Sequence, residues 1–112
     1  MSQALSGRIT IAPQVLTTVV AQTALAMEGV RGLGARPSHI TGARGRKAVA
    51  AGVEAVVADN TVTISLIVDV APGVNMMALA AALQQEIAHN IEHILGMQVA
   101  RVDVTIGDVV FP

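Results

Sequence analysis

The residues whose types and spacing could do chemistry begin with the run His89-Asn-Ile-Glu92-His93. Two histidines four residues apart share one face of a helix and can chelate a metal ion, and the order H-x-x-E-H matches the inverted zinc-protease motif. A catalytic zinc needs a third protein ligand, and only 19 residues follow His93. We therefore interpret the run as a polar helix face, with Glu86 and Glu92 within helical reach of the histidines, and expect neither metal nor cofactor.

A second concentration of functional groups is the Gly- and Arg-rich stretch from Arg36 to Lys47, which is typical of a surface loop. Its cations could hold phosphate, RNA or an anionic membrane surface. It is not a phosphate-binding P-loop, because the spacing differs and no Ser or Thr follows the lysine. A solvated loop is the simpler interpretation, and anion binding is the alternative. The candidate contacts for an anion or partner are Arg36, Arg44, Arg46 and Lys47.

Other reactive arrangements are absent from the sequence. The chain has no cysteine, which excludes disulfides, thiolate zinc sites and a cysteine nucleophile. No serine lies in a G-x-S-x-G motif. Asp69 and Asp103 fall on two predicted strands, where neighbouring carboxylates could do acid–base work, although Arg101 could neutralise one of them. We predict no catalytic residue and expect a protein that is not an enzyme.

The elements that would position these groups follow from apolar periodicity. Pro13 suits the first turn of a helix that Gly29 ends, and Asn75 can cap a second helix that Gly96 stops. Asp59-Asn60 is typical of a hairpin turn, and Gly52 of a bulge inside a strand. The predicted strands, of which the second is the least defined, cover residues 7–11, 30–35, 49–57, 61–70 and 100–106.

The order of these elements is β-α-β-β-β-α-β, and both helices are amphipathic. We therefore predict a single α+β domain over residues 1–112, with two layers in which both helices pack on one face of a mixed, mainly antiparallel sheet. The outer side of the first helix is polar but almost uncharged, which favours packing against a partner. The candidate self-association face consists of Thr17, Thr18, Ala21, Gln22 and Leu25.

The composition of the chain also favours a protein that binds other proteins. Hydrophobic residues make up 53% of the 112 residues and charged residues 13%. There is no apolar run of about 18–20 residues and no secretory pattern near the N-terminus, so we expect a cytoplasmic protein that does not span the membrane. With one Phe, no Tyr and no Trp, the chain lacks the aromatic platforms of single-stranded nucleic-acid binders, and we do not expect nucleic acid as a partner. The excess aliphatic surface favours a protein partner.

Charge is distributed unevenly along the chain. Residues 1–47 carry a formal charge of +5 and residues 48–112 carry −6, for a net charge of −1. Mixing of the two sets on folding is the simpler interpretation. The alternative is a bipolar surface that favours head-to-tail self-association.

Several motifs, taken in order, resemble one known family. Their residues are Gly7-Arg-Ile-Thr-Ile-Ala12, Gly29-Val30, Gly52-Val53, Asp59-Asn60, Gly73-Val-Asn75, Gln84-Gln85, Gly96-Met-Gln-Val99 and Val102-Asp-Val104. Over nearly the whole chain this order is similar to the alkaline shock protein family, also called the envelope or general stress response family. The departures from the family pattern are Ala12-Pro13, Pro72, Leu95 and the Arg-rich insert 36–47.

The resemblance implies a small non-enzymatic stress protein with no established catalytic residues. Some members of this family form oligomers or filaments and are recruited to the membrane by an integral-membrane anchor protein. The leading hypothesis is thus a self-associating scaffold, cytoplasmic and peripheral at the inner face of the cell membrane. Two competing hypotheses are an anion- or nucleic-acid-binding module that uses the loop 36–47, and a metal-dependent enzyme built on His89, Glu92 and His93.

Overall fold

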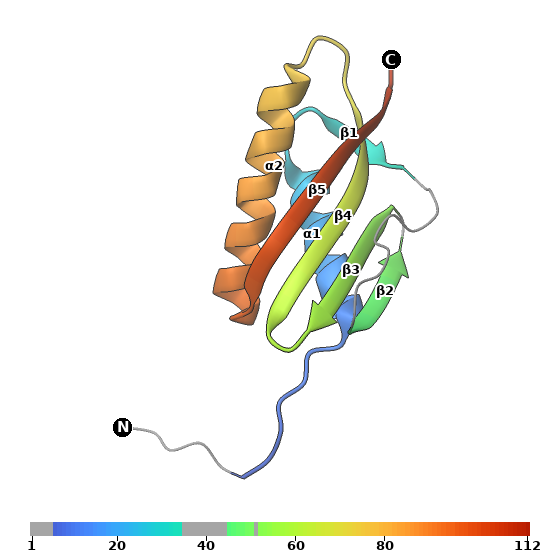
Figure 1. Cartoon of the computed structure of the whole chain (residues 1–112). Helices are drawn as coiled ribbons and strands as arrows, with labels where there is room; N and C mark the ends of the chain where they lie inside the picture. The colour runs from blue at the N-terminus through green and yellow to red at the C-terminus, as the bar shows by residue number, and fades with distance from the viewer. Residues whose placement is uncertain (1–5, 35–44, 51) are drawn as a thin grey trace.

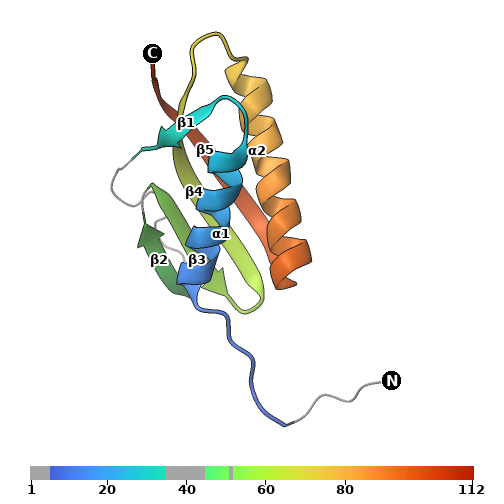
Figure 2. The ribbon, with the colours of Figure 1, turned by 180° about the vertical axis from the view of Figure 1, so that it is seen from behind.

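The computed structural model describes residues 6–34, 45–50 and 52–112. It has two layers, a five-stranded sheet and two helices that both lie against one face of it (Figures 1 and 2). The predicted two-layer α+β fold is confirmed. In chain order the elements are α1 (Pro13–Ala26), β1 (Val30–Leu33), β2 (Arg46–Ala50), β3 (Val53–Ala58), β4 (Thr61–Val70), α2 (Met76–Asn90), the π-helical turn η1 (Ile91–Leu95) and β5 (Gln98–Val109).

Strand β4 is the centre of the sheet. On one edge it pairs antiparallel with β3 through residues 61–66 and then with β1 through residues 68–70. The change occurs at Ile67, whose N–H donates to the Gly52 carbonyl while its own carbonyl accepts from Gly34 N–H. On its other edge β4 pairs in parallel with β5. Among the described residues, β2 pairs only with β3, and β1 and β5 each pair only with β4, so these three strands each leave one edge without a strand partner.

The core lies between the sheet and the helices. Strand β4 supplies five side chains of this core. They are aliphatic, occupy every second position as the alternation predicts, and are fully buried. Three residues of α1, two of α2 and Ile91 of η1 close the other side. Each buried Val, Leu or Ile side chain of this core contributes about 1.5–3 kcal/mol through burial. These residues are Val62, Ile64, Leu66, Val68 and Val70 of β4 with Leu16, Val20, Ala24, Leu83, Ile87 and Ile91.

Local signals set the ends of both helices. Pro13 occupies the first turn of α1, as predicted. The side chain of Asn75 accepts a hydrogen bond from the N–H of Ala78 at 3.0 Å and caps α2. The helix α2 continues into η1, which ends at Gly96 with a φ of +68°. The two helices lie side by side on the sheet. A hydrogen bond links them, from the Nδ2 atom of Asn90 to the Oγ1 atom of Thr23 at 2.9 Å.

Two predicted strands differ from the structure. Residues 7–11 form no strand, and Ile9 is 95% exposed on a segment that leaves the two layers (Figure 1). The alternation is present, but none of the described strands pairs with this segment. The single strand predicted over residues 49–57 is a hairpin of β2 and β3, so a bulge at Gly52 is wrong. Gly52 has a φ of +82° and lies so close to the Gly34 carbonyl that no side chain fits.

These differences change the element order to α-β-β-β-β-α-β. The less defined strand predicted over residues 30–35 is present as β1, and its residue 35 lies outside the described residues. The turn at Asp59-Asn60 is confirmed, and Asp59 has the positive φ, at +57°. Strand β5 is longer than its alternating stretch predicts, because its pairing with β4 continues from Gln98 to Val109.

Candidate interaction surface

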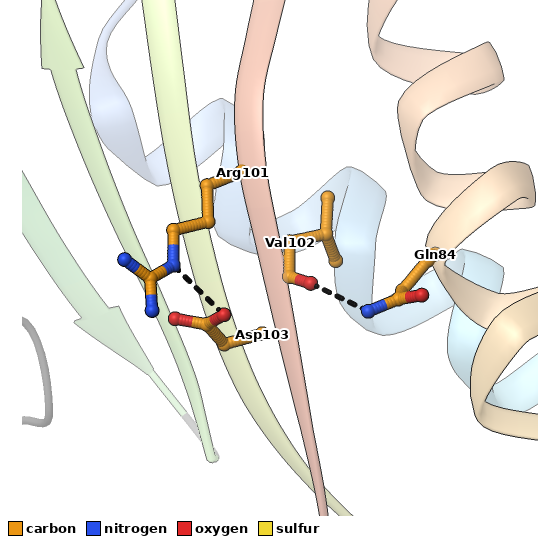
Figure 3. A network of polar contacts seen from close by, with 4 residues as sticks. All are labelled: Gln84, Arg101, Val102 and Asp103. Carbon is orange, nitrogen blue, oxygen red and sulfur yellow. Dashed lines mark hydrogen bonds and ion pairs between the residues drawn. The ribbon is translucent and has the colours of Figure 1, made fainter. Parts of the chain in front are cut away.

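The outer edge of β5 is the longest stretch of strand without a strand partner in the described part of the chain. Such an edge exposes main-chain N–H and C=O groups that can pair with another chain. Figure 3 shows the Val102 carbonyl turned away from β4, where it accepts a hydrogen bond from the Nε2 atom of Gln84 at 3.0 Å. Because Gln84 belongs to α2, the helix covers this acceptor of the edge with a single side chain.

Charged side chains stand on both sides of this acceptor. Arg101 and Asp103 lie on the outer face of the sheet, by which we mean the face away from both helices, and their register partners on β4 are Thr63 and Ser65. The Nε atom of Arg101 pairs with the Oδ1 atom of Asp103 at 2.9 Å (Figure 3). The side chains are 70% and 45% exposed, so solvent screens the pair and it adds little stability.

Helix α2 adds an uncharged flank to this edge. Helical spacing places Met77, Ala81, Gln84 and Ala88 on one side of α2, and the contact of Gln84 with β5 shows that this side faces the strand edge. Met77 is 81% exposed, Ala81 and Gln84 are exposed, and Ala88 is half-buried. We call the outer edge of β5 together with these four residues the edge surface.

The outer side of α1 matches the predicted self-association face only in part. Thr18, Gln22 and Leu25 are exposed, and Leu25 is exposed by 53%. Ala21 is half-buried and packs against the core. Thr17 is 4% exposed, and its hydroxyl donates to the Gln14 carbonyl at 2.9 Å, so its place on an outer face is wrong. The helix turns Thr17 toward the sheet because Thr17 lies four residues after Pro13 and three before Val20, and both of these are buried.

A groove separates the two helices on the surface, and the bond between Asn90 and Thr23 lies in it. The groove widens on both sides of this bond, to about 370 Å³ and about 240 Å³. Gln22 of α1 and Ile94 of η1 line the smaller part, and Ile94 is 66% exposed. The helical layer thus offers a second exposed surface, less regular in its hydrogen-bonding groups than the strand edge.

Of the four predicted anion contacts the structure describes two, and it does not bring these two together. Arg36 and Arg44 lie outside the described residues. Arg46 and Lys47 are consecutive on β2, so their side chains point to opposite faces of the sheet. The Nη2 atom of Arg46 donates to the Ile11 carbonyl at 3.0 Å, whereas the Nζ atom of Lys47 pairs with the Oε2 atom of Glu54 at 2.6 Å. Both cations therefore make contacts within the chain.

The two histidines lie side by side on the surface of the helical layer. The rings of His89 and His93 stack with centroids 4.1 Å apart, and both residues are exposed. Within residues 6–34, 45–50 and 52–112, no group of three or more His, Asp and Glu side chains is placed to hold a metal ion.

Asp69 and Asp103, which the sequence left open as neighbours, do not lie side by side in the structure. Asp69 lies opposite Asp108 and Asp103 lies opposite Ser65, so the two acids are four residues apart along the sheet, or about 13 Å at 3.3 Å per residue. Arg101 does neutralise Asp103, as the sequence indicated.

Taken together, the described residues define a small α+β protein whose most distinctive feature is an open sheet edge. In this part of the chain no helix is long and apolar enough to cross a membrane. The sequence matches the model of the alkaline shock protein 23 family, described as having a cell envelope-related function, over residues 1–111, and the chain belongs to this family. The resemblance seen in the sequence is confirmed.

Solved structures support the fold. The zinc form of a single-substitution variant of the MamM CTD superposes with a TM-score of 0.59, at 13% identity, over 85% of this chain and 84% of that chain. A triple-substitution variant of the same domain superposes with a TM-score of 0.52, also at 13% identity, over 85% of this chain and 93% of that chain. At this identity the likeness concerns the fold alone. No curated protein matches the sequence.

Proposed function

We propose that this protein is a non-enzymatic component of the envelope stress response that acts as a self-associating scaffold through protein–protein contacts. The observation that carries the proposal is the edge surface: a long outer strand, one of whose acceptors is covered by a single glutamine, beside an uncharged helix flank. Membership of a family with a cell envelope-related function supports the setting. The protein acts by binding, and its first partner is a second copy of itself.

Recruitment to the membrane is part of the same proposal. An integral-membrane anchor protein would hold the scaffold at the cytoplasmic face of the envelope, as the family resemblance implies. A test is to fractionate cells and follow this protein in the membrane pellet. Release by a high-pH wash that leaves integral proteins in place would support peripheral attachment. An entirely soluble pool, in unstressed and stressed cells alike, would refute recruitment.

Self-association itself is tested by light scattering coupled to size exclusion, over a concentration range on the order of a hundredfold and at two salt levels. We expect the mass to rise from one chain to an assembly as concentration increases. A strict monomer throughout the range would refute the scaffold proposal.

Two exposed apolar residues allow a matched comparison of surfaces. Met77→Lys places a charge on the edge surface, and Leu25→Lys places the same charge on the outer side of α1. Because both side chains are largely in solvent, neither change should unfold the protein. We expect Met77→Lys to weaken assembly and Leu25→Lys to leave it unchanged. If instead Leu25→Lys weakens assembly and Met77→Lys does not, the protein self-associates through the outer side of α1 and not through the edge surface.

A further inference from the structure

The sequence Arg101-Val102-Asp103 is self-complementary when two strands run antiparallel. If Val102 of one copy lies opposite Val102 of a second copy, then Arg101 of each copy lies opposite Asp103 of the other. Both charged side chains already project from the same face of the sheet. Directly opposite charges on neighbouring strands attract, whereas like charges in these positions repel. One pairing therefore produces two opposite-charge pairs.

The main chain agrees with this register. In an antiparallel ladder, residues whose N–H and C=O groups point outward exchange two hydrogen bonds with the residue opposite, and the next pair along has closer side chains. The Val102 carbonyl points outward, as its bond to Gln84 shows (Figure 3). Val102 thus suits the hydrogen-bonded position on the two-fold axis, and Arg101 and Asp103 suit the close positions beside it.

The helix flank meets its own copy in the same arrangement. The two-fold axis that relates two antiparallel strands is perpendicular to the plane of the sheet, so both α2 helices lie on the same side of the joined sheet. The flank of Met77, Ala81, Gln84 and Ala88 then faces the same flank of the second copy. These side chains carry no charge, and the alanines allow close approach. The ladder is irregular at Ala100, where the pairing of β5 with β4 shifts register, so this flank has to supply contacts beyond the short regular stretch.

From these contacts we infer that two copies pair β5 to β5 about an axis at Val102, with two Arg101–Asp103 pairs across the junction. The inference rests on the proposed self-association and names its geometry. The contact is isologous and closes on itself, so the edge surface alone gives a dimer with one continuous sheet and no fibre. Gln84 occupies the Val102 acceptor in the single chain and must release it, so Gln84 competes with the second copy.

Charge-reversal variants test this register directly. Arg101→Asp puts two acids opposite each other twice in the homodimer, and Asp103→Arg does the same with two bases. Each variant alone should dimerise about tenfold more weakly or worse, measured by sedimentation equilibrium. An equal mixture of the two variants should form a heterodimer within about threefold of the wild-type affinity, because every opposing pair in it is complementary. Native mass spectrometry of a mass-tagged variant identifies the mixed species.

The mixture also separates contacts between chains from contacts within one chain. Both single variants lose the bond between Arg101 and Asp103 of the same chain, so only a contact between chains explains recovery on mixing. Asp108→Arg is the matched control on β5, and it should leave the affinity unchanged because Asp108 lies outside the proposed pairing. Gln84→Ala should tighten the dimer, since it frees the Val102 acceptor. A looser dimer would overturn the competing role of Gln84.

The outcomes distinguish this inference from the proposed function. If the wild-type chain assembles but both charge variants assemble equally well, this register is overturned while self-association stands. If both variants are weak and their mixture is equally weak, the symmetric pairing is overturned. If the wild-type chain stays a monomer at every concentration, the proposed function fails and the register with it.

Discussion

A single methyl group at residue 107 should destabilise the fold through one contact. Ile67 of β4 is 3% exposed and lies on the outer face between Gly34 and Gly107. An ideal Cβ atom on Gly107 would stand 2.7 Å from the Cγ2 atom of Ile67 and 3.3 Å from the Oδ1 atom of Asp69. Carbon atoms in contact prefer about 3.5–4.0 Å. The φ of Gly107 lies outside the left-handed region, so the backbone accepts alanine and Ile67 is the obstacle.

The size of the effect follows from overpacking. Forcing one extra methyl into a packed site raises the free energy of the native state by about 1–3 kcal/mol, and we expect Gly107→Ala to lower the free energy of unfolding by that amount. Ile67→Ala alone should lower it by about 2–5 kcal/mol through the cavity it leaves. In the double variant the nearest obstructing atom is gone and only the contact with Asp69 remains, so most of the penalty of Gly107→Ala should disappear. The coupling energy between the two positions is therefore about 1–3 kcal/mol.

Urea unfolding followed by far-ultraviolet circular dichroism suits a chain without Trp or Tyr. All variants should be compared at one low protein concentration, so that self-association does not enter the free energy of unfolding. Gly32→Ala is the matched control, because its new Cβ atom would meet only the Oδ2 atom of Asp69, at 4.0 Å. It should change stability by less than about 0.5 kcal/mol. Equal losses from Gly107→Ala in the wild-type and Ile67→Ala backgrounds would refute the reasoning.

Three further predictions concern single contacts. Asn75→Ala removes the cap of α2 and should lower the free energy of unfolding by about 1 kcal/mol in the same urea assay; no change would mean that the bond to the Ala78 N–H adds nothing. In Gly52→Ala the new methyl group would collide with the Gly34 carbonyl at a φ of +82°, so the free energy of unfolding should fall by about 3 kcal/mol or more. An unchanged melting temperature would contradict this. Lys47→Met removes a charged partner from the buried carboxylate of Glu54, so the free energy of unfolding should fall by about 1–3 kcal/mol. Adding Glu54→Gln should recover part of this loss.

Features set by neighbouring residues could be predicted from the sequence. The cap at Asn75 needs only the next three residues, and the turn at Asp59-Asn60 needs only a residue that accepts a positive φ. The alternation of β4 identifies its buried face because its side chains alternate between the two faces of one sheet. Each of these decisions is local, and each is found in the structure.

Features that depend on residues far apart in the chain could not be predicted from the sequence. Residues 7–11 and β4 show the same alternation, but only β4 has neighbouring edges to pair with, and the sequence does not state where edges lie. At the division into β2 and β3, Gly52 lies against Gly34, and the sequence alone does not show this contact between distant residues. The edge surface escaped prediction for the same reason, since the contact of Gln84 with Val102 exists only once β5 is known to be the outer strand.

A sheet edge binds extended chains through groups that every protein possesses, so an edge used for assembly needs a feature that selects the correct partner. Protein interfaces usually obtain much of their affinity from Trp, Tyr and Arg, and this chain contains a single aromatic residue. Arg101 is the only Lys or Arg among residues 48–112, and it lies on the outer strand with Asp103 two positions away. In the proposed dimer, hydrogen bonds of the main chain supply attraction without aromatics. The two charge pairs make the register at Val102 the one in which two acidic halves of the chain can meet without repulsion at the junction.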